Sequence, residues 1–349
     1  MILSERICLA DKIQRLKRRT AETVTESFFE KHPDLSLRYG ARWRELTIED
    51  AGYHIEFLAG SIVSGDEVAF GDYLRWASKM LEARGIAPAY LAENLEQIER
   101  ALAANVDAVE HRTIATFVRA GLAELTEELE SETARSGPGL ALSCSVYVQA
   151  ILRGDRRAAE AVVAEAMRHG SSTMDIYIEV FQTALYEVGR EWENGKIPVA
   201  TEHMATAITQ TLMAQVYSKM SRSTENRGGA VITGVQNELH QIGGNMVADL
   251  LDANGWDVRF LGSNAPHAGI LAAIEEHKPN LLGISVTVLF NLPELCRLVA
   301  DVRSRFPQIR IIVGGAAFRS CPSLWREVGA DGYGPDLRSV LEVVDRIAA

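Results

Sequence analysis

The stretch AVITGVQNELHQIGG, residues 230–244, decides the fold class of the C-terminal part of the chain. It reads as a short apolar strand, a polar loop and the start of an amphipathic helix. Further apolar runs occupy 258–261, 281–286, 309–313 and, briefly, 331–333, and amphipathic helical segments lie at 244–254, 268–277 and 292–306. This alternation predicts a doubly wound, flavodoxin-like parallel sheet of about five strands over residues 228–349.

Residues 140–225 are predicted to form a four-helix bundle. One helix starts at Gly154-Asp155 and stops at Gly170, and the triplet Ser171-Ser172-Thr173 offers caps for the next. That next helix carries Phe181, Leu185, Val188 and Trp192 at offsets of four, three and four, which is a single apolar stripe.

Gly195 and Pro198 end this helix, and Thr201 is expected to cap the one that follows. Because the connection is short, the two helices should pack antiparallel. Trp192 and the pair Glu202-His203 then lie at the same end of the bundle.

Residues 1–135 are predicted to form a helical sensor domain, and a globin-like sensor or a dimerisation domain without a ligand are the alternatives. The segment is rich in aromatic side chains, and the glycine- and proline-containing stretch 136–139 marks its boundary with the bundle.

The charge, the cysteine spacing and the apolar runs of the chain indicate which classes of protein are disfavoured. The chain has 349 residues and a formal net charge of -11, which disfavours binding to nucleic-acid phosphates. The basic run 12–19 is followed at once by acids, so it is predicted to be a solvated helix face. Four scattered cysteines form no C-x-x-C pair, and no signal peptide or membrane-spanning run is present, so we expect a cytoplasmic protein.

Candidate ligand-binding residues lie in three loops that follow predicted strands. In an open parallel sheet, ligands bind beyond the carboxyl ends of the strands, near the switch in strand order. The first loop holds Glu238, His240 and Gly243, the second holds Ser285 and Thr287, and the third holds Gly314 and Gly315. A loop histidine can reach a metal as a neutral imidazole, and a carboxylate two residues earlier can fix its tautomer.

These loops resemble those of the cobalamin-binding domains of methionine synthase, corrinoid proteins and methylmalonyl-CoA mutase, over the whole of residues 228–349. The resemblance implies that His240 replaces the cofactor's dimethylbenzimidazole as the lower ligand of cobalt. It also implies that the displaced nucleotide tail runs beside Ser285, Thr287, Gly314 and Gly315. Glu238 stands where aspartate is common in that family, and Thr287 stands where leucine often occurs.

The bundle resembles the helical cap of CarH-type cobalamin photoreceptors, because Trp192 is followed by nine residues and then Glu202-His203. Carried over by position, the resemblance implies that Trp192 stacks over the adenosyl group of adenosylcobalamin, that Glu202 hydrogen-bonds it and that Val199 lines the pocket. After light breaks the cobalt–carbon bond, His203 would take the upper position on cobalt.

The N-terminal segment departs from those photoreceptors, which begin with a DNA-binding winged helix. The layout is more similar to the photocobilins, which also bind biliverdin. A bilin needs aromatic walls and cations at its rim. The segment offers Trp43, Tyr53, Phe57, Tyr73 and Trp76 as walls, and Arg38, Arg42, His54, Arg75 and Arg84 as rim residues.

The sequence therefore favours a light-sensing adenosylcobalamin-binding photoreceptor, with biliverdin as second chromophore and without enzymatic activity of its own. Its output would be a light-dependent homo-oligomeric state or contact with a downstream protein, without nucleic acid or membrane as partner. Two alternatives remain open. One is a corrinoid protein that carries methyl groups for a methyltransferase, and the other is a helical regulatory or scaffold protein with a degenerate cofactor site.

Overall fold

The computed structural model describes residues 1–35, 41–127, 142–319 and 321–348, and they form two compact units. The first unit comprises Met1–Glu132 together with Val288–Arg297 and Ala317–Val328. The second unit comprises Thr133–Thr287, Leu298–Ala316 and Gly329–Ala349. The predicted boundary at 136–139 lies outside the described residues.

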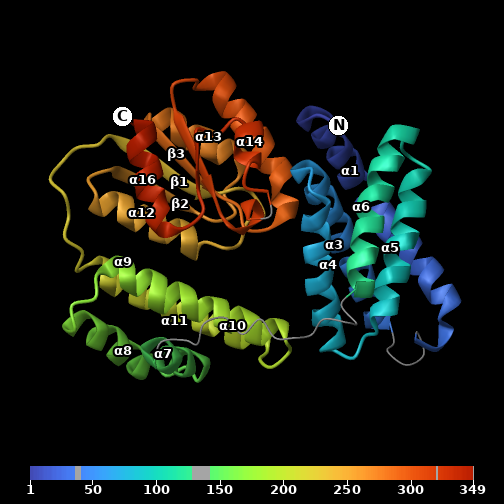
Figure 1. Cartoon of the computed structure of the whole chain (residues 1–349), viewed down its shortest axis with the longest axis horizontal. Coiled ribbons are helices and arrows are strands. Elements are labelled where there is room, and N and C mark those ends of the chain that lie inside the picture. Colours follow the sequence, from blue (N-terminus) through green and yellow to red (C-terminus); the bar gives the residue numbers. More distant parts are fainter. Residues whose placement is uncertain (36–40, 128–141, 320, 349) are drawn as a thin grey trace. The chain divides into compact units, whose positions relative to one another are not determined.

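The N-terminal part of the first unit consists of helices that run side by side (Figure 1). They are α1 (Leu3–Lys31), α3 (Ala41–Ser64), α4 (Glu67–Glu82), α5 (Pro88–Ala103) and α6 (Ala108–Glu127). Asp66 caps α4 by accepting a hydrogen bond from the Val68 N–H at 3.0 Å, and Pro88 stands in the first turn of α5. The basic run predicted as a solvated face is paired with acids, as Lys12 with Glu110 at 2.6 Å and Lys17 with Glu56 at 2.5 Å.

The helical cap of the second unit is the predicted four-helix bundle. Its elements are α7 (Leu142–Leu152), α8 (Arg156–Arg168), the continuous run of α9 (Thr173–Asp175), the π-helix η2 (Ile176–Gln182) and α10 (Thr183–Glu193), and then α11 (Val199–Tyr217). Ser172 caps α9 in a reciprocal capping box with Asp175, as the sequence indicated. The prediction that Thr201 caps the last helix is wrong. The helix begins at Val199, so the N-cap is the residue before it, Pro198, whose backbone is extended. Thr201 therefore lies inside the first turn.

The C-terminal part of the second unit is a parallel sheet with helices on both faces (Figure 1). Its strands are β1 (Gly229–Gly234), β2 (Asp257–Gly262), β3 (Leu281–Ser285), β4 (Arg310–Gly314) and β5 (Gly332–Gly334). The helical elements are α12 (Ile242–Ala253), α13 (His267–His277), η3 (Leu289–Asn291), α14 (Leu292–Arg305), η4 (Ala316–Phe318), α15 (Leu324–Glu327) and α16 (Leu337–Ala348). Of these, η3, α15, residues 292–297 of α14 and residues 317–318 of η4 belong to the first unit.

The strand order β2-β1-β3-β4-β5 confirms the predicted flavodoxin-like sheet. The chain moves from β1 outward to β2 and then returns to the other side of β1, so the switch in strand order lies between β1 and β3. There Gly234 is aligned with Ser285, and Ser285 is aligned with Gly314. The loops predicted to carry chemistry therefore leave the sheet at neighbouring positions on one edge.

Candidate cofactor-binding site

The His240 ring is held by a carboxylate that is completely buried. The Nδ1 atom of His240 lies 2.6 Å from Oε1 of Glu238, and the backbone N–H of His240 donates to the same oxygen at 2.9 Å. The other oxygen of Glu238 accepts the backbone N–H of Thr287 at 2.7 Å. The Glu238 side chain has no exposed area, whereas that of His240 is 59% exposed. A proton on Nδ1 therefore points to the carboxylate, and Nε2 is left as the free lone pair of an accessible ring.

The electrostatics of this pair agree with its geometry. Burial by itself would raise the pKa of Glu238, but the hydrogen bonds from His240 and from the Thr287 N–H outweigh it, so the pKa is lowered. The hydrogen bond to Glu238 raises the pKa of His240, against the effect of desolvation. The carboxylate thus stays ionised inside the fold and makes the imidazole a stronger base.

Asn264, a residue that sequence reasoning missed, fixes the His240 loop from the β2 side. Its backbone N–H donates to the Glu238 carbonyl at 2.7 Å, and its side-chain oxygen accepts the Asn237 N–H at 2.8 Å. Asn264 and Asn237 both have positive φ, at 52° and 69°. Asparagine tolerates that backbone region, but its occurrence in a loop does not indicate which distant loop it will bond.

The predicted glycines leave room beside this loop. A Cβ built on Gly243 would meet nothing within 4 Å, so there is open space beside this residue, three positions after His240. Gly315 has φ of 104°, and a Cβ there would come within 2.2 Å of the Val286 carbonyl oxygen, which only glycine avoids. Val286 also donates its N–H to the Gly314 carbonyl at 2.9 Å. The loops after β3 and β4 are therefore bound to each other, with Ser285 at the end of β3 and Thr287 in the loop that follows it.

The residues predicted for the cap lie at one end of the pair of helices α10 and α11, as expected for antiparallel packing. Trp192, half-buried, lies in the last turn of α10, and Val199 and Glu202 lie in the first turn of α11. His203 pairs with Glu202 through Nδ1 at 2.5 Å, and its ring is 74% exposed. The pKa of His240 is raised chiefly by its hydrogen bond to Glu238, and the charge of Glu202 adds a smaller contribution in the same direction.

The cap is joined to α12 by two tyrosine–aspartate hydrogen bonds that the sequence did not predict. The hydroxyl of Tyr177, in the π-helix, donates to Asp249 at 2.7 Å, and that of Tyr217 donates to Asp252 at 2.8 Å. Burial raises the pKa of Asp249 to about 6. Beside these bonds lies a cavity of about 390 Å³, lined by Gln210, Ala214, Tyr217, Gln241, Asn245, Asp249 and Phe260. Its lining offers amide, carboxylate and phenol groups, and Gln241 follows His240 directly in the chain.

In the first unit, several residues of the predicted bilin site pack against one another. Phe57 stacks on Tyr73 with ring centroids 3.6 Å apart, and buried His54 lies 2.6 Å from the Tyr73 hydroxyl through Nδ1. The ring spacing leaves no room for a flat pigment between Phe57 and Tyr73, so those two residues are not its opposing walls. Tyr53 is exposed, and Trp76 lies 6.0 Å from Tyr73.

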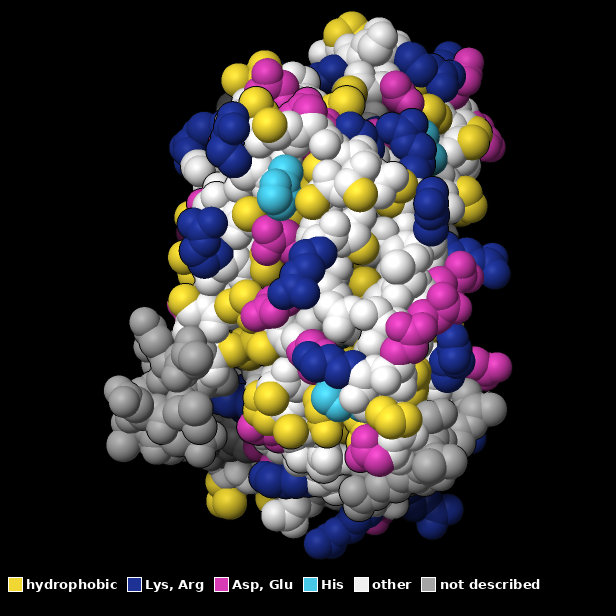
Figure 2. All heavy atoms as spheres, turned by 90° about the vertical axis from the view of Figure 1, so that its right-hand side faces the viewer, with side chains coloured by type: hydrophobic (Ala, Val, Ile, Leu, Met, Phe, Trp, Pro, Cys, Tyr) yellow, Lys and Arg dark blue, Asp and Glu magenta, His cyan; other side chains and the backbone are white. Residues whose placement is uncertain are grey.

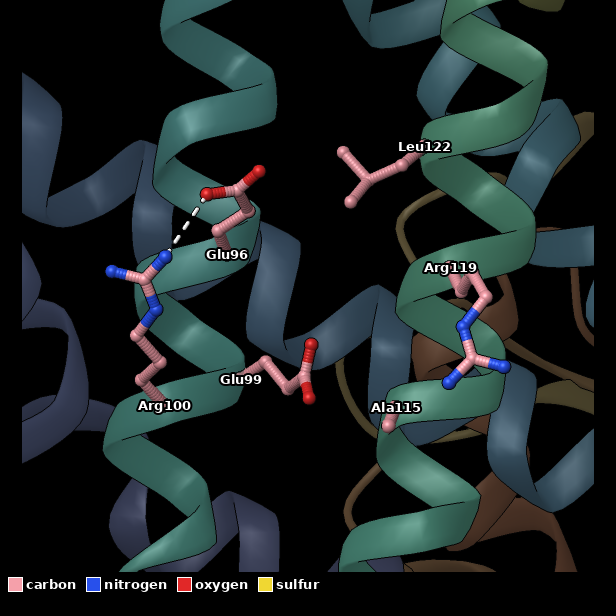
Figure 3. A pocket seen from close by; sticks show the side chains of 6 residues that line it. All are labelled: Glu96, Glu99, Arg100, Ala115, Arg119 and Leu122. Carbon is pink, nitrogen blue, oxygen red and sulfur yellow. Dashed lines mark hydrogen bonds and ion pairs between the residues drawn. The ribbon is translucent and has the colours of Figure 1, made fainter.

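The cationic side chains predicted for the bilin rim have other surroundings. Arg75 pairs with Asp72 and Glu124, and Arg84 donates to the Met80 carbonyl at 2.6 Å. Arg42 is exposed, and Arg38 lies outside the described residues. Figure 2 shows one face of the molecule on which basic and acidic side chains are interspersed. A cavity of about 340 Å³ between α5 and α6 is lined by Glu96, Glu99, Arg100, Ala115, Arg119 and Leu122, so none of the predicted wall residues lines it (Figure 3).

Comparison with known protein families agrees with both parts of the second unit. Residues 228–342 match a B12 binding domain, and residues 145–217 match a second model that is also described as a B12 binding domain. The chain therefore carries B12-binding domains, which makes it a cobalamin-binding protein. This confirms the broader of the two resemblances seen in the sequence.

Individual relatives are corrinoid proteins. The chain is 27% identical over 207 residues to trimethylamine corrinoid protein 1 of Methanosarcina acetivorans, which covers 57% of this chain and 93% of the relative. A corrinoid protein of Desulfitobacterium hafniense is 24% identical over 212 residues, covering 57% and 94%. The structure of the monomethylamine corrinoid protein of Methanosarcina barkeri has the same fold, with a TM-score of 0.51 and 20% identity over 58% of this chain and 96% of that one. The narrower resemblance to light sensors stays a prediction.

Each helix in the described part of the chain is either too short or too polar to span a lipid bilayer.

Proposed function

We propose that the second unit holds cobalamin against the carboxyl edge of its sheet, with His240 as the lower ligand of cobalt. The observation that carries the proposal is the buried Glu238, which takes the Nδ1 proton and leaves Nε2 free on an exposed ring. The residues present fit the cofactor, because the free imidazole supplies one nitrogen donor and open space adjoins Gly243. Bound cobalamin would supply a cobalt ion that exchanges its upper group. In this arrangement Ser285, Thr287, Gly314 and Gly315 would border the nucleotide tail.

The test of His240 is a pair of variants. His240→Ala should bind cobalamin more weakly and without the absorption spectrum of histidine-ligated cofactor. His267→Ala is the matched control, because His267 also bonds a carboxylate, Asp301 at 3.0 Å, in the same domain. Equal spectra and affinities for His240→Ala and His267→Ala would remove His240 from the site.

The first candidate activity is methyl carriage for a methyltransferase partner, and the protein would then be a carrier without catalytic activity of its own. Support comes from the relatives, because trimethylamine corrinoid protein 1 aligns along 93% of its own length with this chain. The cap and the sheet domain are thus the parts shared with such a protein.

Methyl carriage predicts that the protein retains methylcobalamin at least as well as adenosylcobalamin, in the dark, after gel filtration. A clear preference for the adenosyl form would contradict this candidate, because a carrier has no need to enclose a large upper group.

The second candidate is a light response through adenosylcobalamin, and one feature of the cap favours it. Trp192, Val199, Glu202 and His203 all lie where α10 ends and α11 begins, and the charge of Glu202 adds to the upward shift in the pKa of His240 that its hydrogen bond to Glu238 mainly causes. An aromatic side chain can shield an adenosyl group there, and Glu202 can accept its hydrogen bonds. The exposed imidazole of His203 is available to bind cobalt once that group leaves. A changed ligand would shift the cap, and this shift would produce the light-dependent oligomeric state.

Illumination separates the two candidates. With adenosylcobalamin bound, green light should convert the wild-type spectrum to that of a bis-histidine product, and chromatography should detect a changed oligomeric state. His203→Ala should lose that product while keeping binding in the dark. His169→Ala is the control, since His169 is equally exposed in the same cap and also pairs with a glutamate, Glu165. Identical photoproducts from His203→Ala and His169→Ala would exclude the role of His203.

Biliverdin as a second chromophore extends the light-sensing candidate to the first unit. Its walls would have to come from Trp43, Tyr53 and Trp76, since Phe57 and Tyr73 stack directly on each other. Biliverdin added to the purified protein should give a red-shifted band that survives gel filtration and is lost on denaturing extraction. If neither the dark nor the illuminated protein retains a band, the first unit has no bilin site.

A further inference from the structure

Helix α3 of the first unit touches the η3 turn backbone to backbone at Gly60. A Cβ built on Gly60 would lie 2.2 Å from the carbonyl oxygen of Leu289 and 2.7 Å from the amide nitrogen of Phe290. Both values are far below normal contact distances, and the opposing atoms are main chain, so neither partner can rotate away. Gly60 is therefore the residue that allows α3 and η3 to approach this closely.

The Phe290 side chain strengthens the same contact. Its ring meets Phe57 edge to face, with centroids 5.2 Å apart, and Phe57 stacks on Tyr73, which in turn lies 2.6 Å from buried His54. The η3 turn is thus attached to the packed aromatic core of the first unit. The first unit fixes the position of Leu289 and Phe290 through backbone contact and through ring packing.

The η3 turn follows directly on a residue of the His240 support. Thr287 is separated from Leu289 by Val288 alone, and the N–H of Thr287 donates to Oε2 of Glu238 at 2.7 Å. The other oxygen of Glu238 holds His240 at 2.6 Å. An unbroken series of covalent bonds and hydrogen bonds therefore runs from η3 through Thr287 and Glu238 to the His240 ring.

We propose that the first unit positions His240 through the η3 turn, so that Gly60 and Phe290 are positioning residues for the lower ligand. A change in the packing around Gly60 would move the Thr287 N–H, loosen the Glu238 carboxylate and weaken the hold on the imidazole. Any ligand or partner that alters the core of the first unit would then alter how firmly His240 is presented. The effect on cobalt ligation rests on the proposed function, whereas the effect on Thr287 does not.

The test compares Gly60→Ala with Gly52→Ala in the full chain. Both glycines lie in α3, but a side chain on Gly52 would meet nothing within 4 Å. In the protein without cofactor, hydrogen exchange of the Thr287 amide should become about tenfold faster in Gly60→Ala, the size expected for losing one hydrogen bond to a charged group, and should not change in Gly52→Ala. With cobalamin bound, Gly60→Ala should show a smaller histidine-ligated fraction than Gly52→Ala.

Phe290→Leu is the second variant, because it removes the ring contact with Phe57 without a backbone clash. It should shift both measurements in the same direction as Gly60→Ala but less, and it decides the question if Gly60→Ala does not fold. Exchange at Thr287 equal to wild type in the folded variants would overturn the proposal. If wild-type protein binds no cobalamin, the proposed function fails, and the Thr287 exchange alone then supports or overturns this coupling.

Discussion

Two histidines with similar hydrogen bonds have opposite properties in this protein. His54 and His240 each place Nδ1 2.6 Å from an oxygen, that of Tyr73 for His54 and that of Glu238 for His240. His54 is only 7% exposed, and burial lowers its pKa to about 4. The His240 side chain is 59% exposed, its partner is completely buried, and the pKa of His240 is raised.

The difference shows how burial decides the use of an imidazole. Burying the ring removes its charge and makes it part of a packed core. Burying the partner carboxylate leaves the ring at the surface, with a fixed tautomer and a stronger lone pair, which is the arrangement of a metal ligand. His54 therefore stabilises the packed core of the first unit, whereas His240 has the environment of a metal ligand in the second unit.

The largest expected effect concerns His54. Because its pKa is lowered from 6.5 to about 4, its contribution to stability is present above pH 6.5 and is lost as the pH falls through 4. Wild type should lose about 3 kcal/mol of unfolding free energy over this window through this group. The glutamine in His54→Gln can still form a hydrogen bond with Tyr73 but does not titrate. The unfolding free energy of this variant should therefore fall by about 3 kcal/mol less than that of wild type over the same pH range. Urea unfolding between pH 7 and pH 4 measures the difference, and parallel curves for the two proteins would contradict a neutral buried His54.

A somewhat smaller effect is expected at the partner of His240. Glu238→Ala removes the acceptor of the Nδ1 proton, so cobalamin affinity should fall about tenfold to a hundredfold, as is usual for residues that orient a metal ligand. Glu276→Ala, on an exposed stretch of α13, is the control. Equilibrium binding of hydroxocobalamin gives the affinities, and equal values for the two variants would mean that the carboxylate does not support the ligand.

The smallest expected effect concerns Asp249, which accepts a hydrogen bond from Tyr177 and so links the cap to the sheet domain. Its pKa is raised from 3.8 to about 6, so the stabilising contribution of its protonated form is present below pH 3.8 and is lost as the pH rises through 6. Asp249→Asn avoids this loss and can still accept the Tyr177 hydroxyl. The variant should be more stable than wild type by about 1 kcal/mol at pH 7.5, after allowance for the access of water, and equal to it near pH 4. Thermal unfolding at both pH values measures this, and a variant less stable at pH 7.5 would show that the ionised form is preferred.

The sequence predicted the parts of this molecule that depend on local pattern. The apolar run 230–235 followed by a polar loop was sufficient to place β1, and the two-residue spacing of Glu238 and His240 predicted their hydrogen bond, which the structure contains. Thr287, the third residue of this hydrogen-bonded group, could not be assigned its role from sequence spacing. Thr287 takes part through its backbone N–H and not through its hydroxyl, and a backbone amide has no mark in the sequence.

Contacts between residues that are far apart in the sequence could not be predicted either. Tyr177 and Asp249 are separated by 72 residues, and no pattern in either helix indicates that they meet. Residues 288–297 belong to the first unit and approach it closely at Gly60. From the sequence alone, Gly60 would be interpreted only as a glycine that weakens a helix. Of the five aromatic residues predicted to form one wall, Phe57, Tyr73 and Trp76 lie together, whereas Trp43 packs against Phe28 and Phe29 and Tyr53 is exposed. Composition does not distinguish a stacked core from the walls of a ligand slot.

The central claim, that His240 ligates cobalt from below, is tested most directly by electron paramagnetic resonance of the protein loaded with cob(II)alamin. With histidine labelled by nitrogen-15, the splitting from the axial nitrogen should change from the nitrogen-14 pattern in wild type and in His203→Ala. In His240→Ala the labelled and unlabelled spectra should be the same. A wild-type splitting that does not respond to labelled histidine would show that the cofactor's own base remains on the metal, and it would contradict the account.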